Sequence, residues 1–374
     1  MRFIAAALLS LSLGFSQPAY RMEEIAKGLG VVYAITTADV NGDKKPDIVA
    51  INNHQLLWFE NPSWTKHVVA ENITKADNVA LAPLDIDRDG KLDFALGADW
   101  QSTNTTGGGS LHWVSSDGKV HNLATEPTLH RIRFSDVDGD RRPELIVVPL
   151  HGRGTKGPAW NDGPGARILV FRVPKNPAAE PWPMEVADES LHIAHNFITV
   201  GREIWVAAAE GIFALRREQG KWRKRQIGEG QPGEIKMGTV HGKRHLATVE
   251  PWHGNSIVVY EEAPRGLWLR TVIESKLNQA HALGWTENAL IAGWRGKPWG
   301  LAGFVHDTAG GWTRFAIDDG VAVEDLAIAD LNGDGREEII AGGRATANIR
   351  VYWRAEAALG LEGRFIPGGA ARTL

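Results

Sequence analysis

A short acidic motif occurs four times in the sequence, and this repetition constrains the fold more than any other feature. The copies are ADVNGDKKPDIVA from Ala38, LDIDRDGKLDFAL from Leu84, SDVDGDRRPELIV from Ser135 and ADLNGDGREEIIA from Ala329. Each copy places oxygen-bearing side chains at alternate positions and then continues into an apolar run. Repetition of one supersecondary unit is typical of propellers and solenoids. Each copy therefore predicts one unit of a repeating β-structure.

The alternating oxygens also predict a metal site in each copy, because a hard cation such as calcium takes six to eight oxygen ligands at short range. An acidic surface turn is the plain alternative, but four copies in the same register disfavour it. The motif resembles the FG-GAP/VCBS repeat. The predicted ligands are Asp39, Asn41, Asp43 and Asp47; Asp85, Asp87, Asp89 and Asp93; Asp136, Asp138, Asp140 and Glu144; and Asp330, Asn332, Asp334 and Glu338.

The spacing of the motifs gives the number of repeats. The intervals between the first ligands are 46, 51 and 194 residues, and the last interval has room for four repeats. Three blades without the metal motif are therefore expected between the third and fourth loops, giving seven blades in all. Seven apolar strands that follow the loop strands agree with this number, beginning at Leu56, Leu111, Ile168, Gly211, Ser256, Leu301 and Asn348.

The outermost strands indicate how the ring closes. Six are recognisable, five of them opening with an aromatic residue: Trp64, Trp182, Trp222, Trp268 and Trp312, with a weaker copy from Val120. The seventh is YRMEEI at Tyr20, at the other end of the chain. An N-terminal strand in the last blade would close the ring and hide exposed edges. We expect an all-β, seven-bladed propeller from Tyr20 to about Arg354, followed by a tail.

The N-terminus predicts export. Arg2 precedes an apolar run from Phe3 to Leu13, and small residues follow, which is typical of a signal peptide over residues 1–17. The propeller domain is then residues 18–374, in a secreted or periplasmic protein. The sequence contains no cysteine, which excludes disulfides, thiol catalysis, zinc–thiolate sites and a lipid-modified cysteine anchor.

Charge and hydropathy exclude two classes of partner. The net charge is -4 with both signs interspersed, so no basic stripe is available for a nucleic-acid backbone. No later segment approaches the ~20 apolar residues that a transmembrane helix needs. A carbohydrate or another small polar ligand is the expected partner, and a protein is the expected partner if the chain is not catalytic.

A ring of polar residues is expected where the innermost strands begin, on the face opposite the calcium loops. Counting back six residues from the first loop ligand gives Tyr33, His130 and Glu324, while pattern matching gives His195, Lys236 and His281. Blade two stays open between Asp77, Asn78 and Val79. Three histidines and a carboxylate are the ligand set of a catalytic zinc or similar divalent ion. Lys236, Tyr33, Glu324 and Asp325 are the catalytic candidates.

The ends of the second strands add aromatic and basic residues at the same mouth. Tryptophan beside polar groups can hold a sugar ring by stacking and hydrogen bonding, although packing between blades is the alternative for each ring. The substrate-binding candidates are Trp100, Trp252, Trp294, Arg295 and Arg344.

Longer segments sharpen the resemblance. LHRIRFSDVDGDRRPELIVVPLHGRG, LHIAHNF, EPWHGN and EDLAIADLNGDGREEIIAGGRAT together resemble the propeller domain of aldos-2-ulose dehydratase. That family's propeller has a zinc-containing cleft and eliminates water from keto sugars. The resemblance implies His130, His195 and His281 as metal-site candidates, with His151 and His253 next. The chain departs from that enzyme in having no room for its cupin and lectin domains.

Two functional hypotheses follow. The first is an exported metal-dependent lyase or dehydratase that acts on a keto sugar or glycoside at the channel mouth, with structural calcium elsewhere. The second is a non-catalytic carbohydrate- or protein-binding propeller of the adhesion type, as in integrins. A fold alone cannot decide between them. A binding module needs no convergent histidine, lysine and tyrosine, whereas metal-assisted proton abstraction uses all three.

Overall fold

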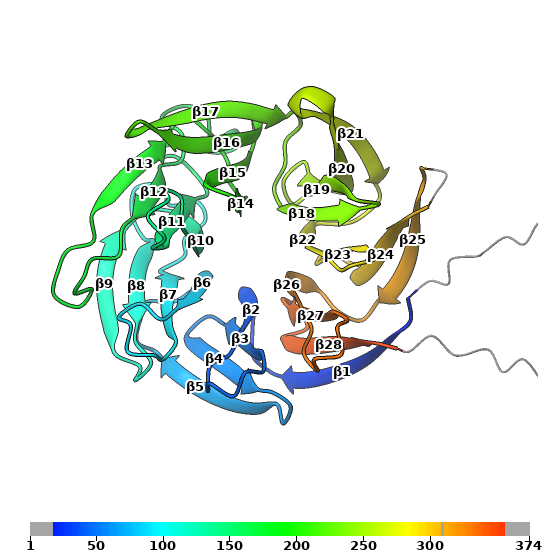
Figure 1. The fold of residues 1–374 in the computed structure, drawn as a ribbon, viewed down its shortest axis with the longest axis horizontal. Helices are drawn as coiled ribbons and strands as arrows, with labels where there is room; N and C mark the ends of the chain where they lie inside the picture. Colours follow the sequence, from blue (N-terminus) through cyan, green and yellow to red (C-terminus); the bar gives the residue numbers. More distant parts are fainter. Residues whose placement is uncertain (1–17, 308–309, 356–374) are drawn as a thin grey trace, which may run out of the picture.

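Seven four-stranded antiparallel sheets form a ring in the computed structural model, which describes residues 18–307 and 310–355 (Figure 1). The prediction of an all-β, seven-bladed propeller is confirmed. The predicted signal peptide and the segment after residue 355 lie outside the described residues. Among the described residues, no helix has the length and apolar character needed to cross a membrane.

Six blades are built from consecutive strands, the first innermost and the fourth outermost. Blade 1 contains β2 (Ala34–Ala38), β3 (Asp47–Ile51), β4 (Gln55–Glu60) and β5 (Thr65–Glu71). Blade 2 contains β6 (Ala80–Leu84), β7 (Asp93–Ala98), β8 (Ser110–Val114) and β9 (Val120–Thr125). Blade 3 contains β10 (Leu129–Ser135), β11 (Glu144–Pro149), β12 (Ile168–Phe171) and β13 (Met184–Asp188). Blade 4 contains β14 (Asn196–Val200), β15 (Glu203–Ala208), β16 (Gly211–Glu218) and β17 (Lys221–Gly228).

The ring continues in the same way through the second half of the chain. Blade 5 contains β18 (Ile235–Val240), β19 (Lys243–Glu250), β20 (Ser256–Ala263) and β21 (Leu267–Glu274), with a 3-10 turn at Pro264–Gly266 before β21. Blade 6 contains β22 (Ala280–Trp285), β23 (Leu290–Trp294), β24 (Gly300–His306) and β25 (Trp312–Asp318). Blade 7 contains β26 (Val323–Ala329), β27 (Glu338–Gly343), β28 (Asn348–Arg354) and β1 (Tyr20–Lys27).

Blade 7 joins the first and last strands of the described part of the chain. Strand β1 pairs antiparallel with β28, from Tyr20 opposite Arg354 to Lys27 opposite Asn348. The Glu24 carboxylate strengthens this pairing, because it accepts hydrogen bonds from Asn348 and Arg350 on the neighbouring strand. The pairing covers the outer edge of β28, which would otherwise offer unpaired backbone groups to another chain.

The apolar core lies between the blades. Strands β3, β7, β11 and β27 are buried along their whole length, because each is covered by blades on both sides. Continuous apolar runs, rather than alternating ones, are expected for strands buried on both faces. The outermost strands are far less buried: β1 and β9 contain only half-buried and exposed residues. Packing of these apolar layers fixes where each innermost strand begins and ends, and so positions the site.

Candidate functional site at the channel mouth

Residues at the beginnings of the innermost strands come together on one face of the ring. His195 directly precedes β14, while His130, His281 and Glu324 lie near the starts of β10, β22 and β26. The last three occupy irregular positions, since the strand register shifts at each of them. Such β-bulges turn a side chain away from the regular pleat. His130, His281 and Glu324 therefore lie at the channel mouth, just before the regular pairing of their strands begins.

His195 is the centre of a cluster of four histidines. Its Nε2 atom lies 3.1 Å from Nε2 of His130 and 2.6 Å from Nε2 of His253. His195, His253 and His281 each offer a nitrogen within 4.8 Å of the others. From the sequence, His253 was a weaker metal-ligand candidate than His130. In the structure His253, and not His130, completes this group of three, and His130 contacts His195 separately.

Hydrogen bonds orient two of these rings toward the centre. The Nδ1 atom of His195 donates to the carbonyl oxygen of Gly233 at 3.0 Å, and Nδ1 of His281 donates to the carbonyl oxygen of Glu324. Each bond fixes the tautomer that leaves Nε2 with a free lone pair. Metal-binding histidines are usually held by this kind of outer contact.

Burial and positive neighbours keep the four rings neutral. Burial lowers the pKa of His130, His195 and His281 well below the usual range, and neighbouring arginine and histidine charges lower it further. The pKa of His253 is lowered to about 2, first by burial and then by Arg295, Arg131 and Arg344. Neutral imidazole is the form that binds a metal.

Two arginines and a glutamate border the histidines. The Glu324 carboxylate is buried, accepts two hydrogen bonds from Nη1 of Arg295 at 2.8 Å and accepts one from Nη1 of Arg344 at 2.8 Å. Nη2 of Arg295 also lies 3.2 Å from Nδ1 of His253, to which it can donate. Glu324 thus holds Arg295 beside the histidines, while its carboxylate lies 4.0 Å from Nε2 of His281.

Tyr33 belongs to a separate hydrogen-bonded group at the edge of this site. Its hydroxyl donates to Oδ2 of Asp77 at 2.8 Å, and Nδ2 of Asn53 donates to Oδ1 of the same carboxylate at 2.6 Å. Burial and Asp77 raise the pKa of Tyr33. Tyr33 therefore keeps its proton at neutral pH, which suits a proton donor better than a base. Asp77, one of three open choices in blade two, is the residue that meets Tyr33.

The tryptophans divide between the mouth and the blade interior. Trp100 stacks on the His130 ring with centroids 4.6 Å apart, and the centroid of the Trp252 ring lies 5.5 Å from that of His195. Trp294 is buried in the core of blade 6, where its Nε1 donates to the carbonyl oxygen of Pro298 at 2.6 Å. Trp100 and Trp252 therefore border the site, whereas Trp294 does not face it.

His151 lies beside the four-histidine cluster. Its ring stacks on Trp160 with centroids 4.1 Å apart, and its Nδ1 atom is buried without a hydrogen-bond partner among the described residues. Burial lowers its pKa to about 4. Trp160 comes from the long loop between β11 and β12, and it was not among the residues expected at the site. An aromatic residue in a polar, glycine-rich loop was the one sequence feature that could have indicated it.

Lys236 lies elsewhere than the ring position that the sequence assigned to it. Glu234 directly precedes Ile235, the first residue of β18, as His195 directly precedes β14. Glu234 is 3% exposed, and its carboxylate contacts Nζ of Lys236 at 3.1 Å. Lys236 instead lines the channel together with Asp325. Blade 5 has no calcium motif from which to count. Pattern matching therefore chose a residue two positions after the one that occupies the ring position.

The four acidic motifs form the turns between the innermost and second strands of blades 1, 2, 3 and 7. Their side-chain oxygens accept hydrogen bonds from backbone amides of the same loop. Asp39 accepts from the N–H groups of Gly42 and Lys44, and Asp330 accepts from those of Gly333 and Gly335. In two loops, three carboxylates lie within 4.8 Å of one another: Asp85, Asp87 and Asp93; and Asp136, Asp138 and Glu144.

The last carboxylate of each loop is buried at the start of the second strand. Asp47, Asp93, Glu144 and Glu338 are all at most 3% exposed, and burial raises the pKa of each. Oδ1 of Asp85 is also buried without a partner among the described residues. A cation placed among these oxygens would offset the cost of burying them.

Comparisons with known proteins agree with this arrangement. The WD40 β-propeller domain of Doa1, a solved structure, is similar in fold with a TM-score of 0.55, covering 90% of this chain and 98% of that one at 10% identity. No curated protein is matched by the chain. Residues 39–96 match the model of the FG-GAP-like repeat, and residues 105–263 match that of the aldos-2-ulose dehydratase β-propeller domain. The resemblance read from the sequence is thus confirmed: one part of the chain matches the FG-GAP-like repeat, and another is similar to the β-propeller domain of aldos-2-ulose dehydratase.

Proposed function

We propose that this propeller is an exported, metal-dependent lyase that eliminates water or an alcohol from a keto sugar or glycoside at the channel mouth. The observation that carries the proposal is the convergence of three histidines from three blades, His195, His253 and His281, whose ring nitrogens lie within 4.8 Å of one another. Burying polar imidazole groups costs free energy unless they gain partners, and a metal ion would be such a partner. The matched dehydratase segment supports the same reaction class.

His195, His253 and His281 would hold a divalent ion such as zinc, leaving a coordination position open for the substrate. The ion would polarise the substrate carbonyl and so acidify the neighbouring C–H bond. His253 can bind the metal through Nε2 only in the tautomer whose Nδ1 carries the hydrogen. In that tautomer Nδ1 cannot accept a hydrogen bond from Arg295. Arg295 can give up this contact because Glu324 already accepts two hydrogen bonds from it.

The remaining groups supply proton transfer. His130 stays free of this ligand set and neutral, so its ring can take the proton from the carbon next to the carbonyl. The electron pair left on that carbon forms a C=C bond as the C–O bond at the adjacent carbon breaks. Tyr33 holds a proton and can deliver it to the leaving oxygen, while Asp77 accepts the hydrogen bond that orients the phenol. The products are an unsaturated ketone and water or an alcohol.

Metal analysis tests this function directly. Purified protein should contain about one transition-metal ion per chain beside calcium, and it should convert a keto sugar to a product with the ultraviolet absorbance of a conjugated ketone. His195→Asn should lose both the metal and the absorbance change. His241→Asn, on the opposite face, is the matched control. Metal-free wild-type protein that still binds sugars would instead support the non-catalytic propeller.

We place calcium in the four acidic loops as a structural ion, and we assign the mature protein to the outside of the cell or to the periplasm. Support for calcium comes from the three-carboxylate groups of blades 2 and 3. Equilibrium dialysis with radioactive calcium tests the first assignment, and N-terminal sequencing of protein exported by its native host tests the second. Release of residues 1–17 is the expected result.

A further inference from the structure

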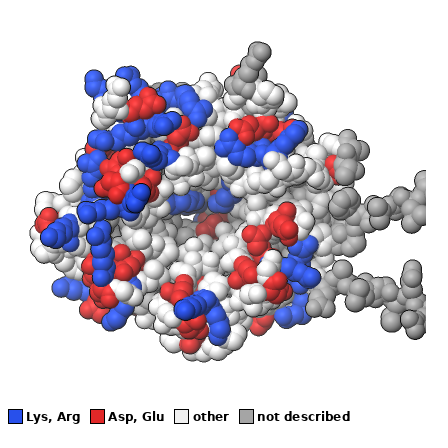
Figure 2. All heavy atoms as spheres, in the orientation of Figure 1, with Lys and Arg blue, Asp and Glu red and all other residues white. Residues whose placement is uncertain are grey.

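A cavity of about 380 Å³ occupies the channel next to the histidine cluster. Its walls come from six innermost strands, β2, β6, β10, β14, β18 and β26. Figure 2 shows the opening at the hub of the ring, with both basic and acidic atoms inside it. The volume lies within the ~300–1,000 Å³ that small-molecule sites usually have.

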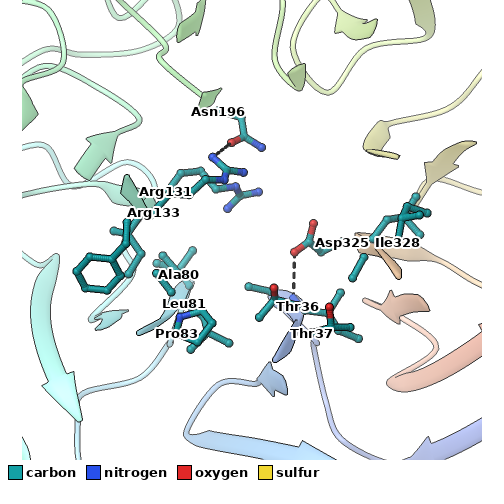
Figure 3. A pocket seen from close by; sticks show the side chains of 18 of the residues that line it. Thr36, Thr37, Ala80, Leu81, Pro83, Arg131, Arg133, Asn196, Asp325 and Ile328 are labelled. Carbon is teal, nitrogen blue, oxygen red and sulfur yellow. Dashed lines mark hydrogen bonds between the residues drawn. The ribbon is translucent and has the colours of Figure 1, made fainter. Parts of the chain in front are cut away.

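Positive charge dominates this cavity. The side chains of Arg131, Arg133 and Lys236 line it, opposite the single lining carboxylate of Asp325. Figure 3 shows the two guanidinium groups extending toward the channel centre and Asp325 approaching from the other side. Lys236 is paired with Glu234 at 3.1 Å, but within the described residues neither guanidinium forms an ion pair.

The bonds that the two arginines do form hold them in place without neutralising them. Nη1 of Arg131 donates to the carbonyl oxygen of His130 at 3.1 Å. Nη1 of Arg133 donates to Oδ1 of Asn196 at 3.0 Å and to the carbonyl oxygen of Phe197, while its guanidinium lies 4.7 Å from the Phe197 ring centroid. Two fixed guanidiniums without a direct ion-pair partner among the described residues, in a confined channel, are expected to attract an anion.

Other lining groups indicate what kind of anion. Oδ2 of Asp325 accepts the backbone N–H of Ile35 at 3.0 Å, and Oδ1, which forms no hydrogen bond within the described part of the chain, can accept one from a ligand hydroxyl. Thr36 and Thr37 add hydroxyl groups to the same wall. The three cations, together with the carboxylates of Asp325 and of Glu234, which pairs with Lys236, leave one net positive charge at this wall. The site therefore fits a ligand that carries one negative charge together with several hydroxyls.

The cavity adjoins the proposed reaction centre through Arg131, which follows His130 in β10. A ligand whose anionic group meets Arg131 would bring its remaining atoms toward the histidines. We propose that Arg131, Arg133 and Lys236 form the subsite for the carboxylate of a sugar acid, with Asp325 binding one of its hydroxyls. This inference rests on the proposed function and narrows its substrates to anionic sugars, of the uronic or keto-acid type.

Binding to the protein without its transition metal tests the subsite apart from catalysis. D-Glucuronate, D-glucose and D-glucose 6-phosphate should be titrated calorimetrically into full-length mature protein that contains calcium but has been treated with a transition-metal chelator. D-Glucuronate should bind at least tenfold more tightly than either of the others. Equal affinity for D-glucose overturns the anion subsite, and tighter binding of the phosphate ester overturns the choice of carboxylate.

Variants then identify the residues. Arg131→Gln and Lys236→Met should each weaken D-glucuronate binding about tenfold, while Arg131→Lys should retain part of the affinity because it keeps the charge. Arg225→Gln, on outer strand β17 where Arg225 pairs with Glu203 at 2.8 Å, should leave the affinity unchanged. Unchanged binding in folded Arg131→Gln and Lys236→Met overturns the assignment.

The two proposals fail separately. Selective D-glucuronate binding by a protein that neither retains a transition metal nor forms an unsaturated product would support the subsite and contradict the lyase. Metal-dependent elimination from a neutral keto sugar, without a preference for sugar acids, would support the lyase and contradict the subsite.

Discussion

His195 of blade 4 and His253 of blade 5 face each other with their Nε2 atoms 2.6 Å apart. They come from different structural contexts: His195 directly precedes an innermost strand, and His253 lies in the loop between β19 and β20 with a φ of 50°. A non-glycine residue with positive φ is uncommon and is retained where the surroundings fix it. The pair therefore depends on the correct docking of two neighbouring blades.

The first prediction concerns this pair as metal ligands. His253→Asn should reduce transition-metal content at least tenfold, because it removes one of three converging nitrogens. Mass-spectrometric metal analysis after dialysis provides the measurement. His54→Asn, at a histidine whose side chain is 46% exposed, is the matched control. If His130→Asn loses the metal while His253→Asn keeps it, the ligand set is the one first expected from the sequence.

The second prediction is the pH dependence of folding in metal-free protein. The pKa of His130, His195 and His281 is well below 6.5 in the folded state, so the unfolded chain takes up more protons as the pH falls. Stability is then complete above pH ~6.5 and declines below it, by about 1.4 kcal/mol per pH unit for each histidine. Urea unfolding between pH 5 and 7 measures the slope.

Histidine variants attribute that slope to the cluster. His130→Asn should make it shallower by the contribution of one group, although the variant itself is less stable at pH 7. His54→Asn should leave the slope as it is. A wild-type stability that stays constant from pH 7 to pH 5 would show that the cluster is readily protonated in the folded protein.

The third prediction concerns the acidic loops. Calcium should raise the melting temperature, because an ion that binds only the folded loops stabilises by about 2.7 kcal/mol at a hundredfold excess over its Kd. The double variant Asp136→Asn with Asp138→Asn should lose part of this gain. Asp117→Asn, in the turn between β8 and β9, should respond to calcium like the wild type. Differential scanning calorimetry with and without calcium decides, and equal melting temperatures contradict calcium binding.

The fourth prediction addresses ring closure. Hydrogen bonds from Lys27, Asn348 and Arg350 lower the pKa of Glu24 to about 2. The stabilisation by Glu24 is present above the usual carboxyl pKa of 4.5 and is lost as the pH falls toward 2. Glu24→Gln should therefore lower the melting temperature by a few degrees at pH 7 and by less at pH 3. Glu218→Gln, at the exposed end of β16, is the control; an equal decrease at both pH values would exclude the ionised carboxylate as the cause.

The fold was predictable because its signals are local and repeated. The copies from Ala38, Leu84, Ser135 and Ala329 fix three intervals, and the aromatic starts of the outer strands indicate the blades that lack the motif. Each blade repeats the same short-range rules, so an error in one blade does not change the architecture.

The site was only partly predictable because it depends on exact register and on contacts between blades. Lys236 was placed two residues away from the position that Glu234 occupies, since a blade without the loop offers no fixed point for counting. Arg131 gave no motif at all. Its importance comes from where its guanidinium lies, between the histidines and the channel cavity, which requires the assembled ring.

The last prediction is that Glu324 raises the metal affinity of the site and that Arg344 does not. Glu324 neutralises part of the charge of Arg295 and Arg344, each of which it meets at 2.8 Å. Glu324→Gln leaves both cations beside the histidines and frees Arg295 to donate more strongly to Nδ1 of His253. Both effects disfavour a bound cation, and loss of an outer contact of this kind typically costs about 10–100-fold in metal affinity.

Arg344→Gln should act in the opposite direction. It removes one positive charge and leaves the two bonds between Arg295 and Glu324 in place, so zinc affinity should stay the same or rise. Competition with a chromogenic chelator at fixed pH measures both variants against the wild type. Because both substitutions disturb the same ion-pair network, a structural defect alone would lower the affinity in both variants. A loss of affinity in Glu324→Gln without a loss in Arg344→Gln therefore requires an electrostatic role for Glu324 at the metal site.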